Sequence, residues 1–295
     1  MASLDGATGR AALWMTGAVV SFSSMAVAGR RLSGELDTFE MMMYRSAIGV
    51  VIVFVIAGVT GHLHEARTKR FGLHVVRNLF HFTGQNLWFY ALTLIPLAQL
   101  FALEFTSPIW VMLLAALFLG EAFTRARITA LALGFLGILL VARPGAEALD
   151  RGVLIALSAA FGFAMTFVTT KALTRTETIT AILVWLTVLQ LLFGVVMAGL
   201  DGDIAWPSAA AWPWVITIGC AGLFAHYCVT SALALAPATV VVPMDFARLP
   251  VIAVVGMLLF DEALDPFVFL GAAAIFLGNW LNLRAEARRV PVTVP

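Results

Sequence analysis

A stripe of polar side chains within an apolar stretch is the first feature of this sequence that could do chemistry. Its members recur at intervals of three or four residues: His74, Asn78, His81, Gln85 and Trp88. This spacing places them on one face of a helix. Polar groups in a membrane helix normally face the bundle interior or a wet cavity. The stripe therefore predicts a cavity lining, and hydrogen bonding along a seam between helices is the alternative.

Charged side chains inside apolar stretches form a second candidate cluster. Asp245 precedes Arg248 by one helical turn, which suits an intrahelical ion pair. We expect Arg45 to pair with Glu104 or Asp245, because an isolated charge at the bilayer centre costs about 2.5 kcal/mol or more. These groups are interpreted as structural ion pairs, with proton coupling by a carboxylate as the alternative. Arg77 is expected to extend toward the membrane surface.

The elements that position these side chains are predicted to be membrane-spanning helices. The chain of 295 residues is 61% hydrophobic and only 12% charged, which is too little polar surface to cover a soluble globule. A spanning helix needs about 20 apolar residues, and continuous apolar runs argue against barrel strands. Ten runs are predicted to span the bilayer: 11–28, 41–59, 73–94, 97–119, 128–141, 153–171, 179–200, 214–235, 238–260 and 267–283.

The sequence contains an internal repeat. The segment 92–143 recurs without a gap as the segment 233–284. The constant difference in residue number between the two copies is here called the repeat offset. It relates Glu104 to Asp245. Each copy holds five predicted spans, which is an odd number, so the second copy must enter the bilayer from the opposite side. Inverted repeats of this kind are typical of secondary transporters, whose site lies between the copies near the bilayer midplane.

The predicted fold class follows from this duplication. We expect an all-α membrane protein with ten transmembrane helices arranged as two inverted five-helix repeats. The first repeat is predicted over 1–144 and the second over 145–295, and together they form one integrated membrane domain. Ten spans are enough to enclose a cavity within one protomer, so the protein is expected to function as a monomer.

The repeat also suggests which polar groups meet. The repeat offset carries Gln85 onto His226, so both are predicted to lie at similar depth. Our hypothesis is that Asn78, His81, Gln85 and His226 bind a solute while Trp88 supplies an apolar wall, because solute pockets combine apolar walls with a few polar groups. The alternative for each buried histidine is a structural hydrogen bond.

Prolines within two predicted spans suggest hinges. Pro108 lies in the fourth span, and Pro243 and Pro250 lie in the ninth. Each proline removes a backbone donor and bends or loosens its helix. Packing without hinge motion is the alternative.

The distribution of Lys and Arg predicts the orientation. Most of these residues fall in the predicted loops on the side of the N-terminus, and positively charged loops stay in the cytoplasm. Both termini are therefore expected to be cytoplasmic. Lys171 is expected at the lipid headgroups, and binding of a solute carboxylate is the alternative. No basic patch suggests a nucleic-acid partner; the expected partners are lipid and a small solute.

A family resemblance rests on the repeated residues. The segment Ala91-Leu-Thr-Leu-Ile-Pro96, followed by Pro108 and Gly120-Glu121, resembles the EamA unit of the drug/metabolite transporter superfamily, and Ala232-Leu-Ala-Leu-Ala-Pro237 with Pro250 and Asp261-Glu262 repeats it. The overall character is most similar to YddG-type exporters of aromatic and other amino acids. This resemblance implies export of small metabolites across a bacterial cytoplasmic membrane.

Several functions compete with amino-acid export by alternating access. Another carrier of the same superfamily would move drugs or sugar-linked metabolites. An intramembrane enzyme could use His81 or His226 as a general base, although an enzyme has no need of two inverted halves. A channel is disfavoured because no charged rings are evident. The sequence has neither a phosphate-binding G-x-x-x-x-G-K-[ST] loop nor an H-E-x-x-H motif, so no cofactor, metal or catalytic residue is expected.

Overall fold

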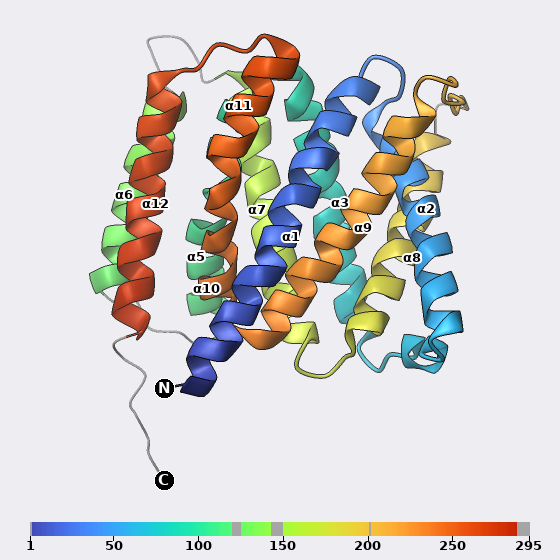
Figure 1. Ribbon diagram of the computed structural model, residues 1–295, viewed down its shortest axis with the longest axis horizontal. Helices are drawn as coiled ribbons and strands as arrows, with labels where there is room; N and C mark the ends of the chain where they lie inside the picture. Colours follow the sequence, from blue (N-terminus) through green and yellow to red (C-terminus); the bar gives the residue numbers. More distant parts are fainter. Residues whose placement is uncertain (1, 120–124, 143–149, 201, 288–295) are drawn as a thin grey trace.

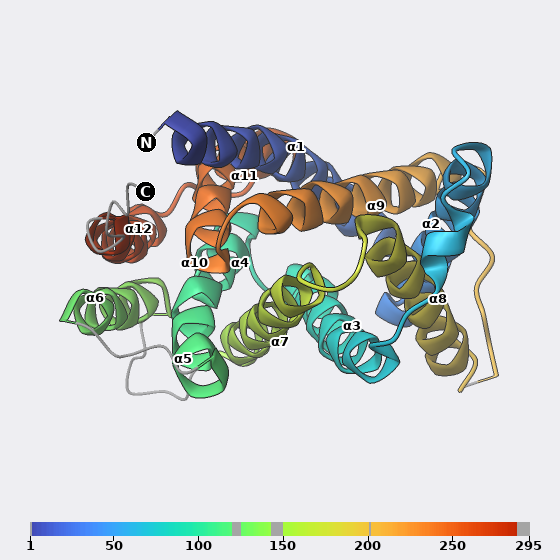
Figure 2. The ribbon, with the colours of Figure 1, turned by 90° about the horizontal axis from the view of Figure 1, so that it is seen from below.

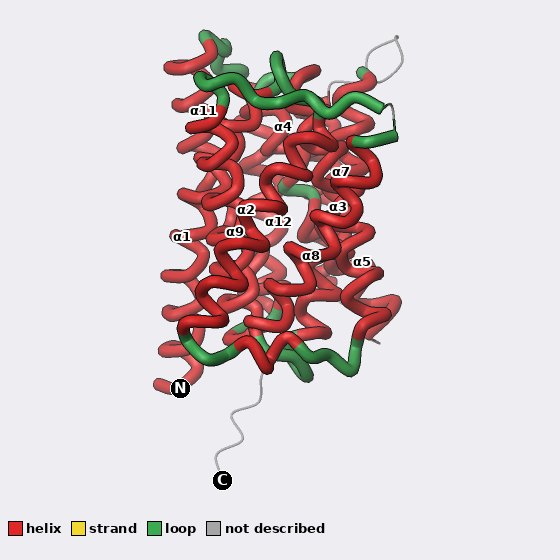
Figure 3. The backbone as a smooth tube through the Cα atoms, turned by 90° about the vertical axis from the view of Figure 1, so that its right-hand side faces the viewer, coloured by secondary structure: helices red, strands yellow, loops and turns green. Residues whose placement is uncertain are grey.

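The computed structural model describes residues 2–119, 125–142, 150–200 and 202–287, and these ranges are almost entirely helical, with no strand among them. The helices are α1 (Ala2–Leu32), α2 (Thr38–Val59), η1 (Leu63–Ala66), α3 (Phe71–Leu94), α4 (Leu97–Glu104), α5 (Ser107–Leu119), α6 (Arg125–Ala142), α7 (Arg151–Leu173), α8 (Ile179–Ala198), α9 (Trp212–Leu235), α10 (Ala238–Val241), η2 (Val242–Ala247), α11 (Arg248–Phe260) and α12 (Pro266–Ala287). Most loops gather at the two ends of the bundle (Figure 3).

Helix length and surface chemistry both fit a bilayer. Among the described residues, six helical segments are long and apolar enough to cross a membrane, and three shorter apolar helices accompany them. Large apolar side chains such as Val51, Leu192 and Phe276 are exposed, whereas soluble proteins rarely expose extended apolar surface. The protein is therefore a multi-pass membrane protein. Helix α3 is not among the six apolar segments, because its polar stripe lowers its mean hydropathy.

The helices pack in pairs that join one repeat to the other. The pairs are α1 with α9, α3 with α7, α2 with α8 and α6 with α12, and Figure 2 shows α1 alongside α9 and α3 alongside α7. The repeat offset carries α1 onto α7 and α3 onto α9. The α1–α9 and α3–α7 contacts are therefore equivalent, as expected for two copies related by a pseudo-twofold axis.

The two copies run through the bundle in opposite directions. The end of α1 lies beside the start of α7, since Arg30 donates a hydrogen bond of 3.0 Å to the carbonyl of Ile95 and a Cβ on Gly152 would lie 2.6 Å from the Ile95 side chain. The start of α1 and the end of α12 both lie at the opposite end of the bundle (Figure 1). The all-α fold of two inverted repeats is confirmed.

The fourth and ninth predicted spans are broken at equivalent points. In the first copy α4 ends at Glu104 and α5 begins at Ser107. In the second copy the 3-10 segment η2 leads into α11, which begins at Arg248, the repeat equivalent of Ser107. Irregular backbone at membrane depth is tolerated only where protein or a watery cavity surrounds it. The breaks therefore lie inside the bundle, where they meet the candidate site.

The three predicted hinge prolines fall at or near these breaks. Pro108 is the second residue of α5, a position where the missing backbone donor has no intrahelical partner to lose. Pro243 lies within η2, and Pro250 is the third residue of α11. Their positions agree with the interruption of both spans, while hinge motion stays a prediction.

Equivalent caps begin the second span of each copy. Asp37 and Glu40 form a capping box at the start of α2, with both hydrogen bonds at 2.8 Å. Thr178, the repeat equivalent of Asp37, caps α8 by accepting the backbone N–H of Ala181 at 3.1 Å. Side-chain caps satisfy backbone donors that the helix itself leaves unpaired, so both spans have defined starting points.

Replacement of Gly162 by Leu is expected to destabilise the protein by separating α3 from α7. A Cβ on Gly162 would lie 3.0 Å from the Gly84 Cα and 3.1 Å from the Phe80 carbonyl oxygen, and overpacking typically costs about 1–3 kcal/mol or more. Thermal unfolding in detergent measures the effect. The control is Gly58→Leu, because nothing lies within 4 Å of a Cβ at Gly58. Equal melting temperatures for the two variants would contradict close α3–α7 packing.

Candidate substrate-binding site

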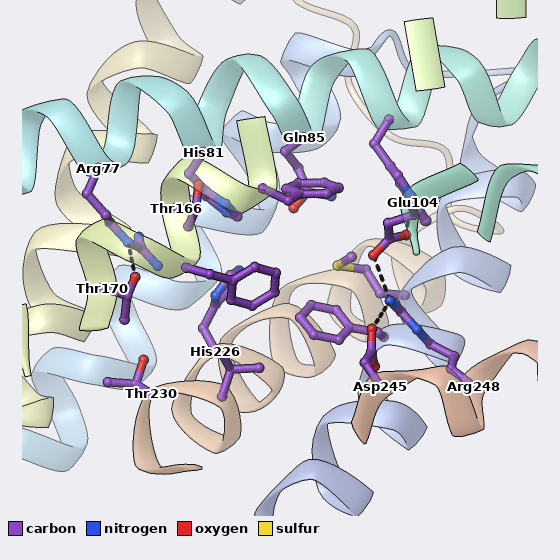
Figure 4. A pocket seen from close by; sticks show the side chains of 16 residues that line it. Arg77, His81, Gln85, Glu104, Thr166, Thr170, His226, Thr230, Asp245 and Arg248 are labelled. Carbon is purple, nitrogen blue, oxygen red and sulfur yellow. Dashed lines mark hydrogen bonds and ion pairs between the residues drawn. The ribbon is translucent and has the colours of Figure 1, made fainter. Parts of the chain in front are cut away.

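A cavity lies between the two repeats beside the broken spans. Its lining comes from α1, α3, α4, α7, α9, η2 and α11: Phe22, Met25, Arg77, His81, Gln85, Trp88, Glu104, Phe163, Thr166, Phe167, Thr170, His226, Val229, Thr230, Asp245 and Arg248. Figure 4 shows its polar side chains converging from α3, α7, α9 and the broken spans. The cavity volume is about 40 Å³, whereas ligand pockets measure about 300–1,000 Å³. In this conformation the cavity is therefore too small for a drug-sized ligand.

The lining follows the internal symmetry of the chain. The repeat offset relates five pairs of lining positions: Phe22 and Phe163, Met25 and Thr166, Gln85 and His226, Trp88 and Val229, and Glu104 and Asp245. Each member of a pair comes from a different repeat. The cavity therefore lies on the pseudo-twofold axis, which is the place where an inverted-repeat carrier binds its solute.

A buried charge cluster joins the two broken spans. Arg248 donates from Nη2 to Glu104 at 2.6 Å and also to Asp245. Glu104 in addition accepts the indole N–H of Trp88 at 2.7 Å. The guanidinium of Arg248 lies 4.5 Å from the Phe101 ring centroid and 4.9 Å from that of Phe22. These contacts hold the end of α4, the η2 segment and the start of α11 together.

Two histidines meet at the centre of the cavity. The rings of His81 and His226 stand perpendicular, with centroids 4.5 Å apart, and both side chains are buried. Neither ring nitrogen of His81 has a hydrogen-bond partner among the described residues, and the same holds for Nε2 of His226 and the hydroxyl of Thr230. Buried polar atoms are normally satisfied, so these atoms are free to bind a solute or water.

Arg77 and Arg45 depart from their predicted environments. Arg77 is 1% exposed and does not extend to the membrane surface, because Thr170 accepts from its Nε at 3.2 Å and Asn78 accepts from its Nη1 at 3.0 Å. Arg45 does not pair with Glu104 or Asp245. Both carboxylates are bound by Arg248 instead. Among the described residues, the guanidinium of Arg45 has one hydrogen-bond contact, 3.7 Å from Nη1 to the Met42 sulfur.

Asn78 does not line this cavity, so the structure gives no support to its predicted role in binding a solute. Its side chain is fully buried and donates to the carbonyl oxygens of His74 at 2.8 Å and Trp185 at 3.3 Å. The amide of Gln190 donates to its Oδ1 at 3.2 Å. Asn78 therefore links α3 to α8, which is the seam considered as the alternative for the stripe. His81, Gln85 and Trp88 do line the cavity, as does His226.

Several lining residues outside α3 were not predicted. Phe22 and Phe163 come from α1 and α7, and Thr166, Thr170 and Thr230 supply hydroxyl groups from α7 and α9. Phenylalanine and threonine are ordinary residues in membrane helices, so neither type alone signals a site. The repeat offset does relate Phe22 to Phe163. This relation was the sequence signal from which the two residues could have been predicted as part of the site.

Equivalent basic side chains make similar contacts at the two ends of the bundle, here called the Arg30 closure and the Lys171 closure. Arg30 donates to the carbonyl of Ile95 and lies 3.0 Å from Glu262. At the other end Lys171, the equivalent of Arg30, donates to the carbonyl of Ala236 at 3.1 Å and to that of Leu233 at 2.6 Å. These carbonyls lie at the end of α9, and the position of Lys171 at the lipid headgroups stays a prediction. The cavity thus lies between two similar closures.

These features define a class of protein. Two inverted repeats, two broken spans and a small cavity on the pseudo-twofold axis are typical of a secondary carrier. The model of the EamA-like transporter family matches residues 9–143 and again residues 150–284. The chain therefore belongs to the EamA-like transporter family of the drug/metabolite transporter superfamily, and a small-metabolite carrier is the class confirmed.

Sequence similarity to bacterial transporters supports this class. The chain is similar to the riboflavin transporter of Brucella anthropi, with 36% identity over 75% of this chain and 78% of the relative. It is 28% identical to the riboflavin transporter of Vibrio cholerae over 94% and 96% of the two chains. The S-adenosylmethionine uptake transporter of Rickettsia conorii is 24% identical over 89% and 88%.

A crystal structure supports the fold independently. It superposes with a TM-score of 0.71 at 18% identity and covers 96% of this chain and 99% of the other. At this identity the similarity supports the fold alone.

The relatives from Brucella, Vibrio and Rickettsia are named as transporters of riboflavin or S-adenosylmethionine. The narrower resemblance to amino-acid exporters therefore finds no support in them.

Replacement of Arg248 by Met is expected to destabilise the protein, because it leaves Glu104 and Asp245 buried without their shared cation. Removing one partner of a buried ion pair typically costs about 3–5 kcal/mol. The triple variant Arg248→Met, Glu104→Gln, Asp245→Asn is expected to recover most of this loss in a thermal unfolding experiment. The control is Arg284→Met, since Arg284 is exposed and lies over the ring of Trp280. Wild-type stability of the single variant would exclude a structural role for the cluster.

Proposed function

We propose that the protein carries riboflavin across the bacterial cytoplasmic membrane by alternating access between its two repeats. The observation that carries the proposal is its similarity to riboflavin transporters from three bacteria, Brucella anthropi, Vibrio cholerae and Rhizobium johnstonii. Transport of amino acids, which the resemblance to YddG-type exporters implied, is the competing proposal. S-adenosylmethionine is a third solute to test, because the Rickettsia relatives take it up.

The chemistry of the cavity suits a flavin. Riboflavin combines a flat aromatic ring system with a uracil-like edge and a chain of hydroxyl groups. Phe22 and Phe163 offer aromatic faces from the two repeats, and flat aromatic groups stack on such rings. The amide of Gln85 can both donate to and accept from the uracil-like edge. The hydroxyl groups of Thr166 and Thr230 can bind the polar chain.

The transport cycle follows from the symmetry of the fold. Opening of the closure at Arg30 would expose the cavity on one side, and opening of the closure at Lys171 would expose it on the other. Because the repeats are equivalent, each can adopt the conformation that its sibling has just left. The proposed orientation places both termini in the cytoplasm. Arg30 then belongs to the outer closure and Lys171 to the inner one.

Reconstituted vesicles test the proposed solute. We expect saturable uptake of radiolabelled riboflavin and counterflow when unlabelled riboflavin is loaded inside, because a carrier exchanges solute across a single alternating site. Flux of S-adenosylmethionine and of an amino-acid panel, measured in parallel with and without a pH gradient, tests the competing solutes and proton coupling. Riboflavin flux no faster than in protein-free vesicles would contradict the proposal.

A matched pair of variants tests whether the flux passes through this cavity. Phe163→Ala removes an aromatic wall and is expected to raise the KM for riboflavin about three- to tenfold, in line with about 0.5–1.5 kcal/mol for an aromatic pair. The control is Phe161→Ala on the same helix, because Phe161 is 37% exposed and does not line the cavity. Equal effects of both variants would place the solute elsewhere.

The histidine pair gives a second test of the site. His81→Ala and His226→Ala are each expected to lower riboflavin transport at least several-fold, because each removes a buried ring with an unpartnered nitrogen at the cavity centre. Expression and melting temperature are measured alongside, so that a folding defect is recognised. Full transport by both variants at normal expression would remove the histidines from the binding site.

A further inference from the structure

Two buried guanidinium groups near the histidine pair have no carboxylate partner. Arg77 is 1% exposed and Arg45 is 5% exposed, and neither lies within 4.0 Å of a carboxylate oxygen among the described residues. Isolated charges at membrane depth are rare and are normally paired. The two groups also repel each other electrostatically. This region of the bundle therefore has an uncompensated positive charge.

The nearby carboxylates are already engaged. Glu104 and Asp245 line the same cavity, but both bind Arg248 at its other end (Figure 4). Glu177 lies beyond the start of α3, where it accepts from the Thr68 hydroxyl at 3.0 Å and lies 4.0 Å from His74. The cavity thus has a charge-paired end at Arg248 and an unpaired cationic end at Arg77.

The cationic end also collects hydrogen-bond donors. Arg77 uses Nε and Nη1 for Thr170 and Asn78, and its Nη2 has no hydrogen bond to any described residue. Thr230 and His81 both line the cavity, and the hydroxyl of the first and the ring nitrogens of the second are buried without partners within the same ranges. Donors arranged around a positive charge are the environment that an oxyanion requires.

Arg45 adds charge from behind this end. A Cβ on Gly222 would overlap the Arg45 guanidinium, so the absence of a side chain there lets the guanidinium pass against α9. Gly222 precedes His226 by one helical turn, so the positive charge of Arg45 lies close to the part of α9 that carries His226. Arg45 lines a separate small cavity together with Gln190. Its positive charge therefore acts on the site from a distance, without contact between Arg45 and a bound solute.

We propose that the Arg77 end of the cavity is a binding site for a phosphate-type oxyanion, either carried by the flavin itself or bound as free phosphate. Charge supports this class, because a phosphate monoester has about −1.5 to −2 charges near neutral pH, and the unpaired charges of Arg77 and Arg45 match it. If the phosphate is part of a flavin, this proposal rests on the proposed function. If the anion is free phosphate, the site does not depend on which solute the protein carries.

Flavin fluorescence in detergent tests the solute-borne case. The wild-type protein is titrated with riboflavin and with flavin mononucleotide, and we expect at least tenfold tighter binding of the phosphorylated form. In Arg77→Gln the ratio of the two affinities is expected to fall at least tenfold, and Arg77→Lys is expected to keep part of it. A merely structural role of Arg77 would weaken both flavins equally. An unchanged ratio in Arg77→Gln would therefore overturn this assignment.

Inorganic phosphate tests the free-anion case without any flavin. We expect phosphate to raise the melting temperature of the wild-type protein more than an equal ionic strength of chloride does, and to lose this effect in Arg77→Gln. If Arg77→Gln does not fold, Thr230→Val replaces it, with weaker binding of phosphate or of flavin mononucleotide as the expected result. If neither flavin binds, the proposed function fails while the phosphate result still decides the anion site. Absence of both a phosphorylated-flavin preference and a phosphate effect would overturn the proposal.

Discussion

The sharing of one guanidinium by two carboxylates, at the crossing of the two broken spans, is the interaction on which the rest of the structure depends. Glu104 and Asp245 are equivalent in the two repeats, but the equivalent of Arg248 is Ser107. A single cation therefore serves both copies. Because lipid cannot satisfy broken backbone or buried charge, this cluster confines both breaks to the interior. It thereby fixes one end of the cavity.

The inverted symmetry explains how a small cavity can serve a carrier. The Arg30 closure and the Lys171 closure use the same geometry, a basic side chain bound to a carbonyl at the end of a helix. The Arg30 closure also contains an ion pair with Glu262, so the two closures are similar without being identical. A solute shifts the balance between two conformations by the difference in its affinity for them. Both closures are formed here, with the cavity between them.

The sequence predicted the architecture better than the contacts within it. The constant repeat offset and the odd number of spans per copy were enough for the inverted fold, and helical spacing was enough to place His81 and Gln85 on an interior face. Spacing cannot tell which helix lies opposite that face. Asn78 therefore proved to bind α8, and Arg45 proved to lie apart from the carboxylates that Arg248 binds. Partner choice depends on packing between distant segments.

The cavity is symmetric in shape and asymmetric in chemistry. The aromatic pair Phe22 and Phe163 is preserved between the repeats, whereas Gln85 is matched by His226 and Trp88 by Val229. A symmetric backbone allows both conformations to be reached with the same packing. The proposed solute, a flavin, has a different group at each end and cannot be bound in one orientation by identical walls. Divergence of the polar lining within a symmetric frame is therefore what a carrier for an asymmetric solute requires.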